Sequence, residues 1–318
     1  MSSVETVRGA VDAGDLGRTL PHEHIIIMEP EALANYGTVY GRYWDEDAAI
    51  AGAVAKLSEL REAGIATIVD PTAPGIGRDI RRIQRVNAQV DINIVVASGV
   101  YSFLGLPNFL TYRDVDAIAA LFAREITDGI DDTGVKAGFI KCAVEAHGMV
   151  GDVPRILAAV AAASVETGAP VMVHTNAAAR TGLLALEALT GAGVDPARIV
   201  IAHMGDSNDM DYMREVAASG AWLGLDRFGI AHFNPDADRI RTLLALLDAG
   251  LRDRVHLSHD SASFLDFFTG NPAFAGEELS YLLINRTVLP QLLAAGATQA
   301  DIDAMMIDNP RRFLAREY

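Results

Sequence analysis

Short apolar runs alternate with longer amphipathic stretches along nearly the whole chain, from about residue 18 to its C-terminal end. The short runs are rich in Val, Ile and Leu, which is typical of parallel strands buried on both faces. Most of them end in a polar residue. We predict eight strands, at 19–28, 65–70, 92–99, 137–143, 170–175, 198–203, 221–226 and 254–260.

Between these runs, apolar residues recur at every third and fourth position, as in a helix with one buried face. Helices are predicted over 47–62, 153–167, 181–192 and 235–249. Successive strands start at 137, 170 and 198, so each start is separated from the next by about the length of one strand plus one helix. This repeat predicts an α/β fold of the (β/α)8 TIM barrel type. We expect the whole chain, 1–318, to form this one domain. A doubly wound open sheet is the alternative, but no Gly-x-Gly-x-x-Gly motif follows the first strand.

The two ends of the chain are expected to close the barrel. Residues 6–11, with a turn at 13–15, predict a short N-terminal β-hairpin at the bottom. After strand eight, the aromatic and Gly-containing stretch 261–276 predicts a long loop over the top. Closing helices are predicted over 277–293, 299–307 and 310–317, with Asn309 as the N-cap before Pro310.

Composition narrows the class of protein. The chain has 318 residues, of which 50% are hydrophobic, enough for a large core. A net charge of −16 argues against nucleic acid or an anionic membrane as partner. Cys142 is the only cysteine, which excludes an intramolecular disulfide and a Cys-rich zinc module. The sequence has neither a signal-peptide pattern nor an apolar run of the ~18 residues that a membrane helix needs, so a cytoplasmic protein is expected.

Polar residues capable of metal binding occur on several predicted strands, mostly near their C-terminal ends, where barrel enzymes carry their functional groups. Alone, each of these histidines is as readily a hydrogen-bonded core residue. Together they predict a metal site, because so many ligand types at one end of a barrel are unexpected by chance. The residues are His22, His24, Lys141, His174, His203 and Asp260.

Lys141 lies in the apolar run Gly-Phe-Ile-Lys-Cys-Ala, where an unpaired ammonium is costly to bury. It is a salt-bridged structural lysine, a Schiff-base lysine, or a lysine carbamylated by carbon dioxide that bridges two cations. The surrounding histidines favour carbamylation.

The motifs resemble those of the phosphotriesterase family in the amidohydrolase superfamily, and most closely its phosphotriesterase-like lactonases. The matching segments are Leu-Pro-His-Glu-His at 20–24, Ile-Lys-Cys-Ala at 140–143, Val-His-Thr at 173–175, Ala-His-Met-Gly-Asp at 202–206, Leu-Asp-Arg-Phe-Gly at 225–229, Leu-Ser-His-Asp at 257–260 and Asp-Asn-Pro-Arg-Arg-Phe at 308–313.

The resemblance implies a centre of two divalent metal ions, with zinc expected before iron, cobalt or manganese. One buried ion is bound by His22, His24 and Asp260, and a more exposed ion by His174 and His203. Carbamylated Lys141 and a hydroxide bridge the two ions. The resemblance also implies a homodimer.

In the reaction that the resemblance implies, the hydroxide attacks the substrate and Asp260 accepts a proton. Tyr101 and Arg227 match a tyrosine and an arginine that line the lactonase pocket. For Tyr101 the alternative is an ordinary loop aromatic, and for Arg227 a salt bridge to Asp226 or Asp206. We expect hydrolysis of lactones, including N-acyl-homoserine lactones (quorum quenching), with weak activity on organophosphate triesters. The alternatives are a dedicated phosphotriesterase (aryldialkylphosphatase) or another carboxylic-ester hydrolase.

The loop after strand eight departs from the lactonase pattern. Ser261-Ala-Ser stands where cysteines are frequent, and no tryptophan occurs in 261–280. The loop phenylalanines either line an acyl-chain channel or pack onto the barrel. They are Phe264, Phe267, Phe268 and Phe274.

The remaining polar residues of these motifs are given supporting or structural roles. Glu23 and His259 face away from their ligand neighbours, which makes Glu23 a surface residue or a support for the ligands and His259 at most a support. We interpret His147, His232 and His256 as surface or core residues.

Two other functions compete with a metal-dependent hydrolase. One is a metal-free aldolase that uses Lys141, and the other is a non-catalytic barrel that binds a small ligand. Neither explains why the histidines and Asp260 converge.

Overall fold

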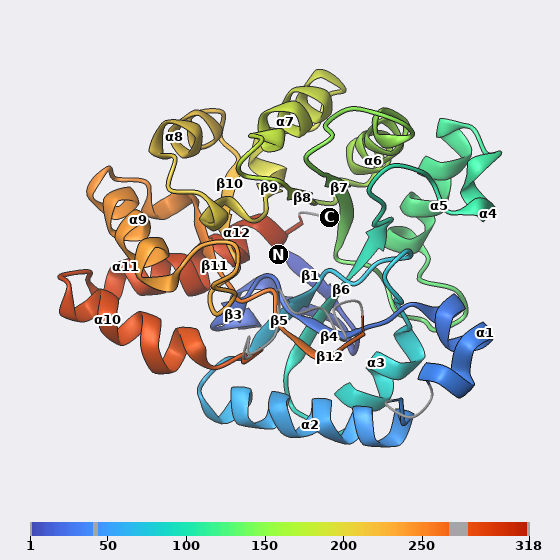
Figure 1. Cartoon of the computed structure of the whole chain (residues 1–318), viewed down its shortest axis with the longest axis horizontal. Coiled ribbons are helices and arrows are strands. Elements are labelled where there is room, and N and C mark those ends of the chain that lie inside the picture. Colours follow the sequence, from blue (N-terminus) through green and yellow to red (C-terminus); the bar gives the residue numbers. More distant parts are fainter. Residues whose placement is uncertain (1, 41–43, 267–278, 317–318) are drawn as a thin grey trace.

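Within the described residues, eight parallel strands form a nearly closed barrel, and helices surround it (Figure 1). The structure is a computed structural model that describes residues 2–40, 44–266 and 279–316. Neighbouring strands follow one another in chain order, which confirms the (β/α)8 barrel; the doubly wound alternative, whose strand order reverses, is wrong. The strands are β3 (Thr19–Leu20), β5 (Thr67–Asp70), β6 (Asn93–Gly99), β7 (Phe139–Val144), β8 (Val171–Thr175), β9 (Ile199–Ile201), β10 (Trp222–Leu225) and β11 (Val255–Leu257).

The first predicted strand, 19–28, is interrupted in the structure. It consists of β3 and of β4 (His24–Ile27), separated at Pro21, whose nitrogen has no hydrogen to donate to a strand ladder. β3 pairs with β5, whereas β4 pairs with β12 (Ala262–Leu265). The predicted loop over the top therefore begins as a strand. The barrel closes where the Asp260 amide donates to the His22 carbonyl, at 3.1 Å.

Helices cover the outside of the barrel. Of the four predicted ones, 153–167 is observed with the same bounds, and the other three differ from those observed by no more than one residue at either end. The observed helices are α1 (Pro30–Tyr40), α2 (Glu46–Glu62), α3 (Ile80–Asn87), α4 (Asn108–Thr111), α5 (Val115–Thr127), α6 (Val153–Thr167), α7 (Thr181–Gly191), α8 (Met210–Ala218) and α9 (Asp236–Asp248). Asp45, Asp79 and Asp114 cap α2, α3 and α5 by accepting a backbone N–H of the first turn. None of the described helices is long and apolar enough to cross a membrane.

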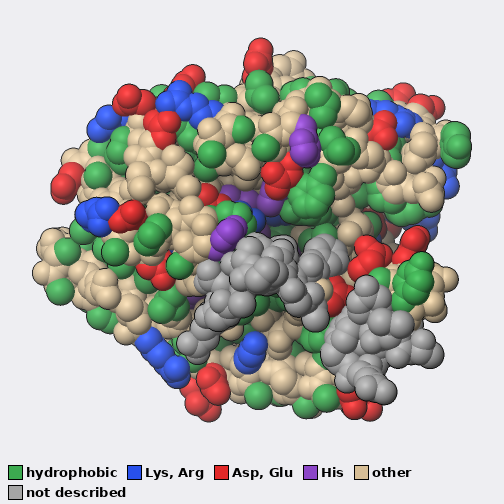
Figure 2. All heavy atoms as spheres, viewed as in Figure 1, with side chains coloured by type: hydrophobic (Ala, Val, Ile, Leu, Met, Phe, Trp, Pro, Cys, Tyr) green, Lys and Arg blue, Asp and Glu red, His purple; other side chains and the backbone are tan. Residues whose placement is uncertain are grey.

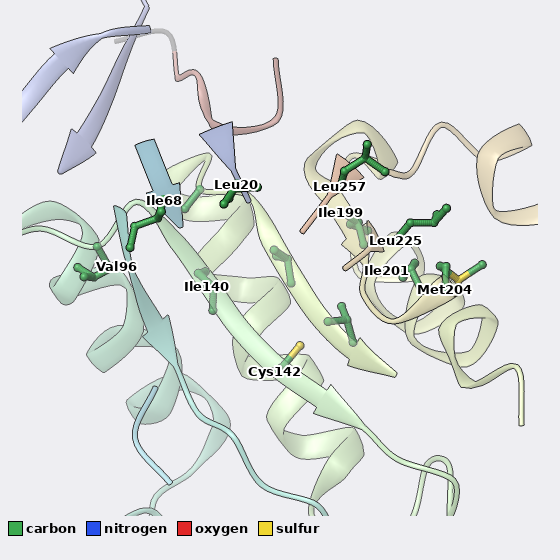
Figure 3. Packing of buried hydrophobic residues seen from close by; sticks show 14 of the residues in the cluster. Leu20, Ile68, Val96, Ile140, Cys142, Ile199, Ile201, Met204, Leu225 and Leu257 are labelled. Atoms are coloured by element: carbon green, nitrogen blue, oxygen red, sulfur yellow. The ribbon is translucent and has the colours of Figure 1, made fainter. Parts of the chain in front are cut away.

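The two largest clusters of the core are separate because strand side chains alternate between two faces. Ile68, Ile140 and Leu225 belong to the larger cluster, which also contains the buried faces of the surrounding helices (Figure 3). Phe139 and Met172 belong to a separate cluster. Lys141 and His174 lie two residues further along the same two strands, on the same face as Phe139 and Met172. The alternation thus directs both polar side chains to one face of the sheet, beside this second cluster.

The predicted N-terminal hairpin is present as the antiparallel pair β1 (Ser3–Thr6) and β2 (Gly9–Asp12). Its turn lies at residues 7–8, however, and the predicted turn residues form the 3-10 helix η1 (Ala13–Leu16). Val4 and Leu16 pack in the same cluster as Phe313 from the other end of the chain.

The C-terminal region differs from the prediction of two short helices. One continuous helical run comprises α11 (Gln299–Asp303), the π-helical turn η7 (Ala304–Asp308) and α12 (Asn309–Leu314). Asn309 is therefore not an N-cap; its buried side chain donates to the carbonyls of Arg252 and Val255. Before it lie the π-helical turn η6 (Ile284–Val288) and α10 (Leu289–Ala294), while the predicted helix start at 277 falls outside the described residues.

Candidate metal centre

The barrel strands bring all six candidate ligands to one cavity. Lys141 and His174 lie on β7 and β8, whereas His203 and Asp260 lie just beyond the ends of β9 and β11. Both of the latter have left-handed backbone, with φ of 66° and 53°. This conformation is uncommon for residues with a side chain and is concentrated at functional sites.

His22, His24 and Asp260 form a compact cluster suited to one metal ion. The Nε2 atoms of both histidines lie 3.2 Å from the same atom, Oδ1 of Asp260. Both imidazoles are almost fully buried. The three residues predicted to bind the buried ion therefore direct their ligand atoms at the same place.

Hydrogen bonds on the far side of each ring fix which nitrogen faces the cavity. Asp226 accepts from Nδ1 of His22 at 2.8 Å and from Nδ1 of His203 at 2.9 Å. His24 Nδ1 contacts the Thr72 hydroxyl at 2.8 Å, and that hydroxyl donates to Asp70. In all three rings Nε2 is therefore the nitrogen that faces the cavity and is available to a metal ion.

His174 uses the opposite nitrogen. Its Nε2 lies 2.6 Å from Glu145 Oε1, so Nδ1 faces Nε2 of His203 at 2.8 Å. Burial lowers the pKa of His174 to about 4 and the pKa of His203 well below its usual value. Both rings are therefore neutral, with two lone pairs directed at one another, an arrangement that a shared cation would stabilise.

The buried amine of Lys141 is the observation that most directly indicates a metal-bridging role. The residue is 1% exposed, and its Nζ has no hydrogen-bond partner among the described residues. Burial lowers the pKa of the amine to about 8. Four imidazoles, one carboxylate and one unpartnered amine are a donor set that fits two divalent cations with a carbamylated lysine between them.

Tyr101 and Arg227 lie at the rim of this cluster. The Tyr101 hydroxyl lies 3.1 Å from Nδ1 of His174, and burial raises the pKa of this phenol, which keeps it protonated. Arg227 donates through Nε to Asp260 and through Nη1 to Asp206, each at 2.8 Å. Burial alone would lower the pKa of Arg227, but the carboxylates of Asp260 and Asp206 outweigh this effect and raise it above its usual value. The alternative salt bridge to Asp206 is thus present, together with one to the candidate ligand Asp260.

A cavity of about 920 Å³ opens above the ligands. Figure 2 shows histidine side chains in a hollow near the middle of this face. Ile27, Ile76 and Leu265 form an apolar part of the cavity wall. Phe264 instead packs edge-on against Trp44, with ring centroids 4.8 Å apart, and Phe267, Phe268 and Phe274 lie outside the described residues.

Several residues that support the ligands were not identified from the sequence. Asp226 and Glu145 orient three of the histidines, and only the position of Asp226 at the end of a predicted strand hinted at its role. Glu23 is fully buried, so of its two interpretations the surface residue is wrong and the support for the ligands fits the structure. It accepts hydrogen bonds from the Ser261 amide and from His259, and so holds the segment that carries Asp260.

The other histidines match their interpretation as surface or core residues. His147 and His232 are exposed, and His256 is buried.

Comparisons with known proteins agree with this geometry. The chain matches the model of the phosphotriesterase family over residues 2–314. A phosphotriesterase homology protein of Mycobacterium tuberculosis is 41% identical over 325 residues, covering 100% of this chain and 99% of the relative. The aryldialkylphosphatase of Saccharolobus solfataricus is 35% identical over 311 residues, covering 97% and 98%. The solved structure of the phosphotriesterase from Mycobacterium tuberculosis matches with a TM-score of 0.93 and 40% identity, covering 99% of this chain and 100% of that one.

Proposed function

The chain belongs to the phosphotriesterase family and is a metal-dependent hydrolase of that type, and from this premise we propose that it opens lactones, with N-acyl-homoserine lactones among them. The observation that carries the proposal is that Tyr101 and Arg227 both lie at the rim of the candidate metal centre, where Tyr101 contacts His174 and Arg227 contacts Asp260. A lactone presents a polar ring and an apolar acyl chain, which suits a cavity with a polar floor and the apolar wall of Ile27, Ile76 and Leu265. Weak hydrolysis of organophosphate triesters and a quorum-quenching role belong to the same proposal.

We assign His22, His24 and Asp260 to one cation and His174 and His203 to a second, with carbamylated Lys141 between them. Zinc is the first choice, and iron, cobalt or manganese suit the same ligands. When bound, the cations polarise the substrate and lower the pKa of a coordinated water.

The chain's own residues then orient the substrate and move the proton. The Tyr101 hydroxyl, kept protonated by burial, is available to donate a hydrogen bond to a substrate oxygen. Asp260 is the residue we assign to accept a proton at Oδ1 or Oδ2. Although burial opposes its ionisation, His22 and Arg227 hold the pKa of Asp260 well below its usual value, so this carboxylate is ionised, as a proton acceptor must be. Arg227, ion-paired with Asp260, steadies this carboxylate.

The test compares kcat/KM of the metal-loaded enzyme for a long-chain N-acyl-homoserine lactone and for an aryl dialkyl phosphate. A preference for the lactone of about 100-fold or more, close to 3 kcal/mol in transition-state binding, supports the proposal. A preference for the phosphate by orders of magnitude overturns it in favour of a dedicated phosphotriesterase. The relative named aryldialkylphosphatase makes that activity the second candidate.

We further propose that the chain works as one domain, as a homodimer and in the cytoplasm. The single domain is supported by the distribution of the candidate ligands, which run from His22 near the start of the chain to Asp260 near its end and meet in one cavity. The homodimer rests on the family resemblance, and light scattering after size-exclusion chromatography tests it.

A further inference from the structure

Lysine is rare in this chain, yet two of its three lysines face the same cavity. Lys56, Lys136 and Lys141 are the only ones in the sequence, and Lys56 and Lys141 line the cavity. The metal centre accounts for Lys141. Lys56 comes from α2 on the outside of the barrel and has no part in that centre.

The ammonium of Lys56 is half-buried, and its hydrogen bonds to the protein are long. Its Nζ lies 3.5 Å from the Ala262 carbonyl and 3.4 Å from the Ser263 carbonyl, at the long limit for hydrogen bonds. Within the described part of the chain, no carboxylate lies within ion-pair distance, 4.0 Å, of this amine. Burial lowers the pKa of Lys56, as expected for a cation that has lost water without gaining a counter-ion.

The other charged side chains of the cavity have closer partners than Lys56. Arg227 is paired with Asp206 and Asp260. Glu29 also lines the cavity, but one of its carboxylate oxygens accepts the amide of Glu31 at 3.2 Å. In a chain with a net charge of −16, Lys56 is thus a cavity cation that lacks a carboxylate partner among the described residues.

The position of Lys56 relates it to the reacting centre. Ser263 follows Asp260 by three residues, a stretch of about 10 Å at most in extended chain. Ala262 pairs with the candidate ligand His24 in the β4–β12 ladder. A substrate held at the metal centre would therefore reach Lys56 with a side arm of several atoms.

We propose that Lys56 forms an anion subsite in the substrate cavity, so that the preferred substrates carry a carboxylate at the end of a short side arm. This inference rests on the proposed lactonase function. A single ammonium with two carbonyl neighbours suits a monoanionic group, because lysine acts as a point charge rather than as a bidentate fork.

The test uses a matched pair of substrates, N-(5-carboxypentanoyl)homoserine lactone and its methyl ester, with metal-loaded enzyme. We expect wild type to prefer the acid, and Lys56→Met to raise KM for the acid about tenfold while leaving the ester within about twofold. Lys56→Arg should restore most of the preference. Lys136→Met, which removes the same charge away from the cavity, should leave both substrates unchanged.

Each contrary result has its own meaning. Wild type that turns over the ester without preferring the acid overturns the anion subsite and leaves the lactonase proposal intact. If KM rises equally for both substrates in Lys56→Met, the lysine only ties α2 to β12, and the subsite is overturned. If neither lactone is turned over, the lactonase proposal fails. Calorimetric binding of the two lactones to wild type and to Lys56→Met then tests the subsite separately. If wild type and Lys56→Met bind the acid with equal affinity, the subsite is overturned.

Discussion

Replacing Asp226 by Asn tests whether the carboxylate that joins His22 and His203 sets up the metal ligands. In the structure this carboxylate accepts three hydrogen bonds, from Nδ1 of His22 at 2.8 Å, from Nδ1 of His203 at 2.9 Å and from the His203 amide at 2.8 Å. The asparagine in Asp226→Asn has nearly the same shape but only one acceptor oxygen. Its amide nitrogen must therefore face one of the imidazole N–H groups.

The size of the effect follows from these bonds. A hydrogen bond to a charged group is worth about 1.5–3 kcal/mol, and a buried donor left without a partner adds a desolvation cost of similar size. One imidazole can escape the clash by moving its proton to Nε2, which removes the lone pair directed at the cavity. We expect metal affinity to fall about 10–100-fold and the free energy of unfolding of the metal-free protein to fall by at least about 2 kcal/mol.

The assay measures metal content after equilibration with a competing chelator, together with urea unfolding of the metal-free protein. Asp248→Asn is the control, because it makes the same change at an exposed position at the end of α9. If Asp226→Asn keeps wild-type metal affinity and unfolds within about 0.5 kcal/mol of wild type, the proposed role of Asp226 is refuted.

Three further predictions concern single side chains. Lys141→Met should lower kcat more than about 100-fold and reduce bound metal, and added short-chain carboxylic acids should restore part of both, as measured by turnover and metal analysis. Tyr101→Phe should lower kcat/KM for lactones about tenfold, from the lost hydroxyl, while urea unfolding changes by no more than about 1 kcal/mol. His256 is buried beside Trp222, and burial lowers its pKa to about 4. As pH falls, the unfolded state takes up this proton first, so His256 lowers the free energy of unfolding between about pH 6.5 and about pH 4. His256→Phe should remove up to about 3 kcal/mol of this decrease, as measured by unfolding across the same pH range.

Three results would contradict these expectations. Lys141→Met with full metal content and turnover would exclude a carbamylated ligand. Tyr101→Phe with unchanged kinetics would leave Tyr101 as a structural aromatic packed on His174. Equal acid sensitivity of wild type and His256→Phe would mean that other groups determine the acid loss.

The barrel was predictable because its strands are buried on both faces, which makes them short apolar runs in the sequence. The exact starts and ends of some strands and helices were harder to predict. Pro21 divides the first strand, and this break is visible only when the partners of β3 and β4 are known. Asn309-Pro310 has the appearance of a helix start, but the π-helical turn η7 carries the helix through to the proline.

That the candidate ligands meet in one cavity was predictable because most of them lie near the C-terminal ends of predicted strands, whereas the residues that support them depend on how side chains meet after folding. Glu145 comes from the segment after β7 and orients His174 from β8. Glu23 reaches the strand-eight segment, more than two hundred residues away in sequence. Spacing along the chain carries no signal for such contacts.

A crystal structure of the metal-loaded enzyme with anomalous diffraction tests the central claim most directly. The account predicts two anomalous peaks about 3.5–4 Å apart, one beside His22, His24 and Asp260 and the other beside His174 and His203, with density for a carboxylate group extending from Lys141 Nζ. An unmodified Lys141, or metal peaks absent from this cavity, would contradict it.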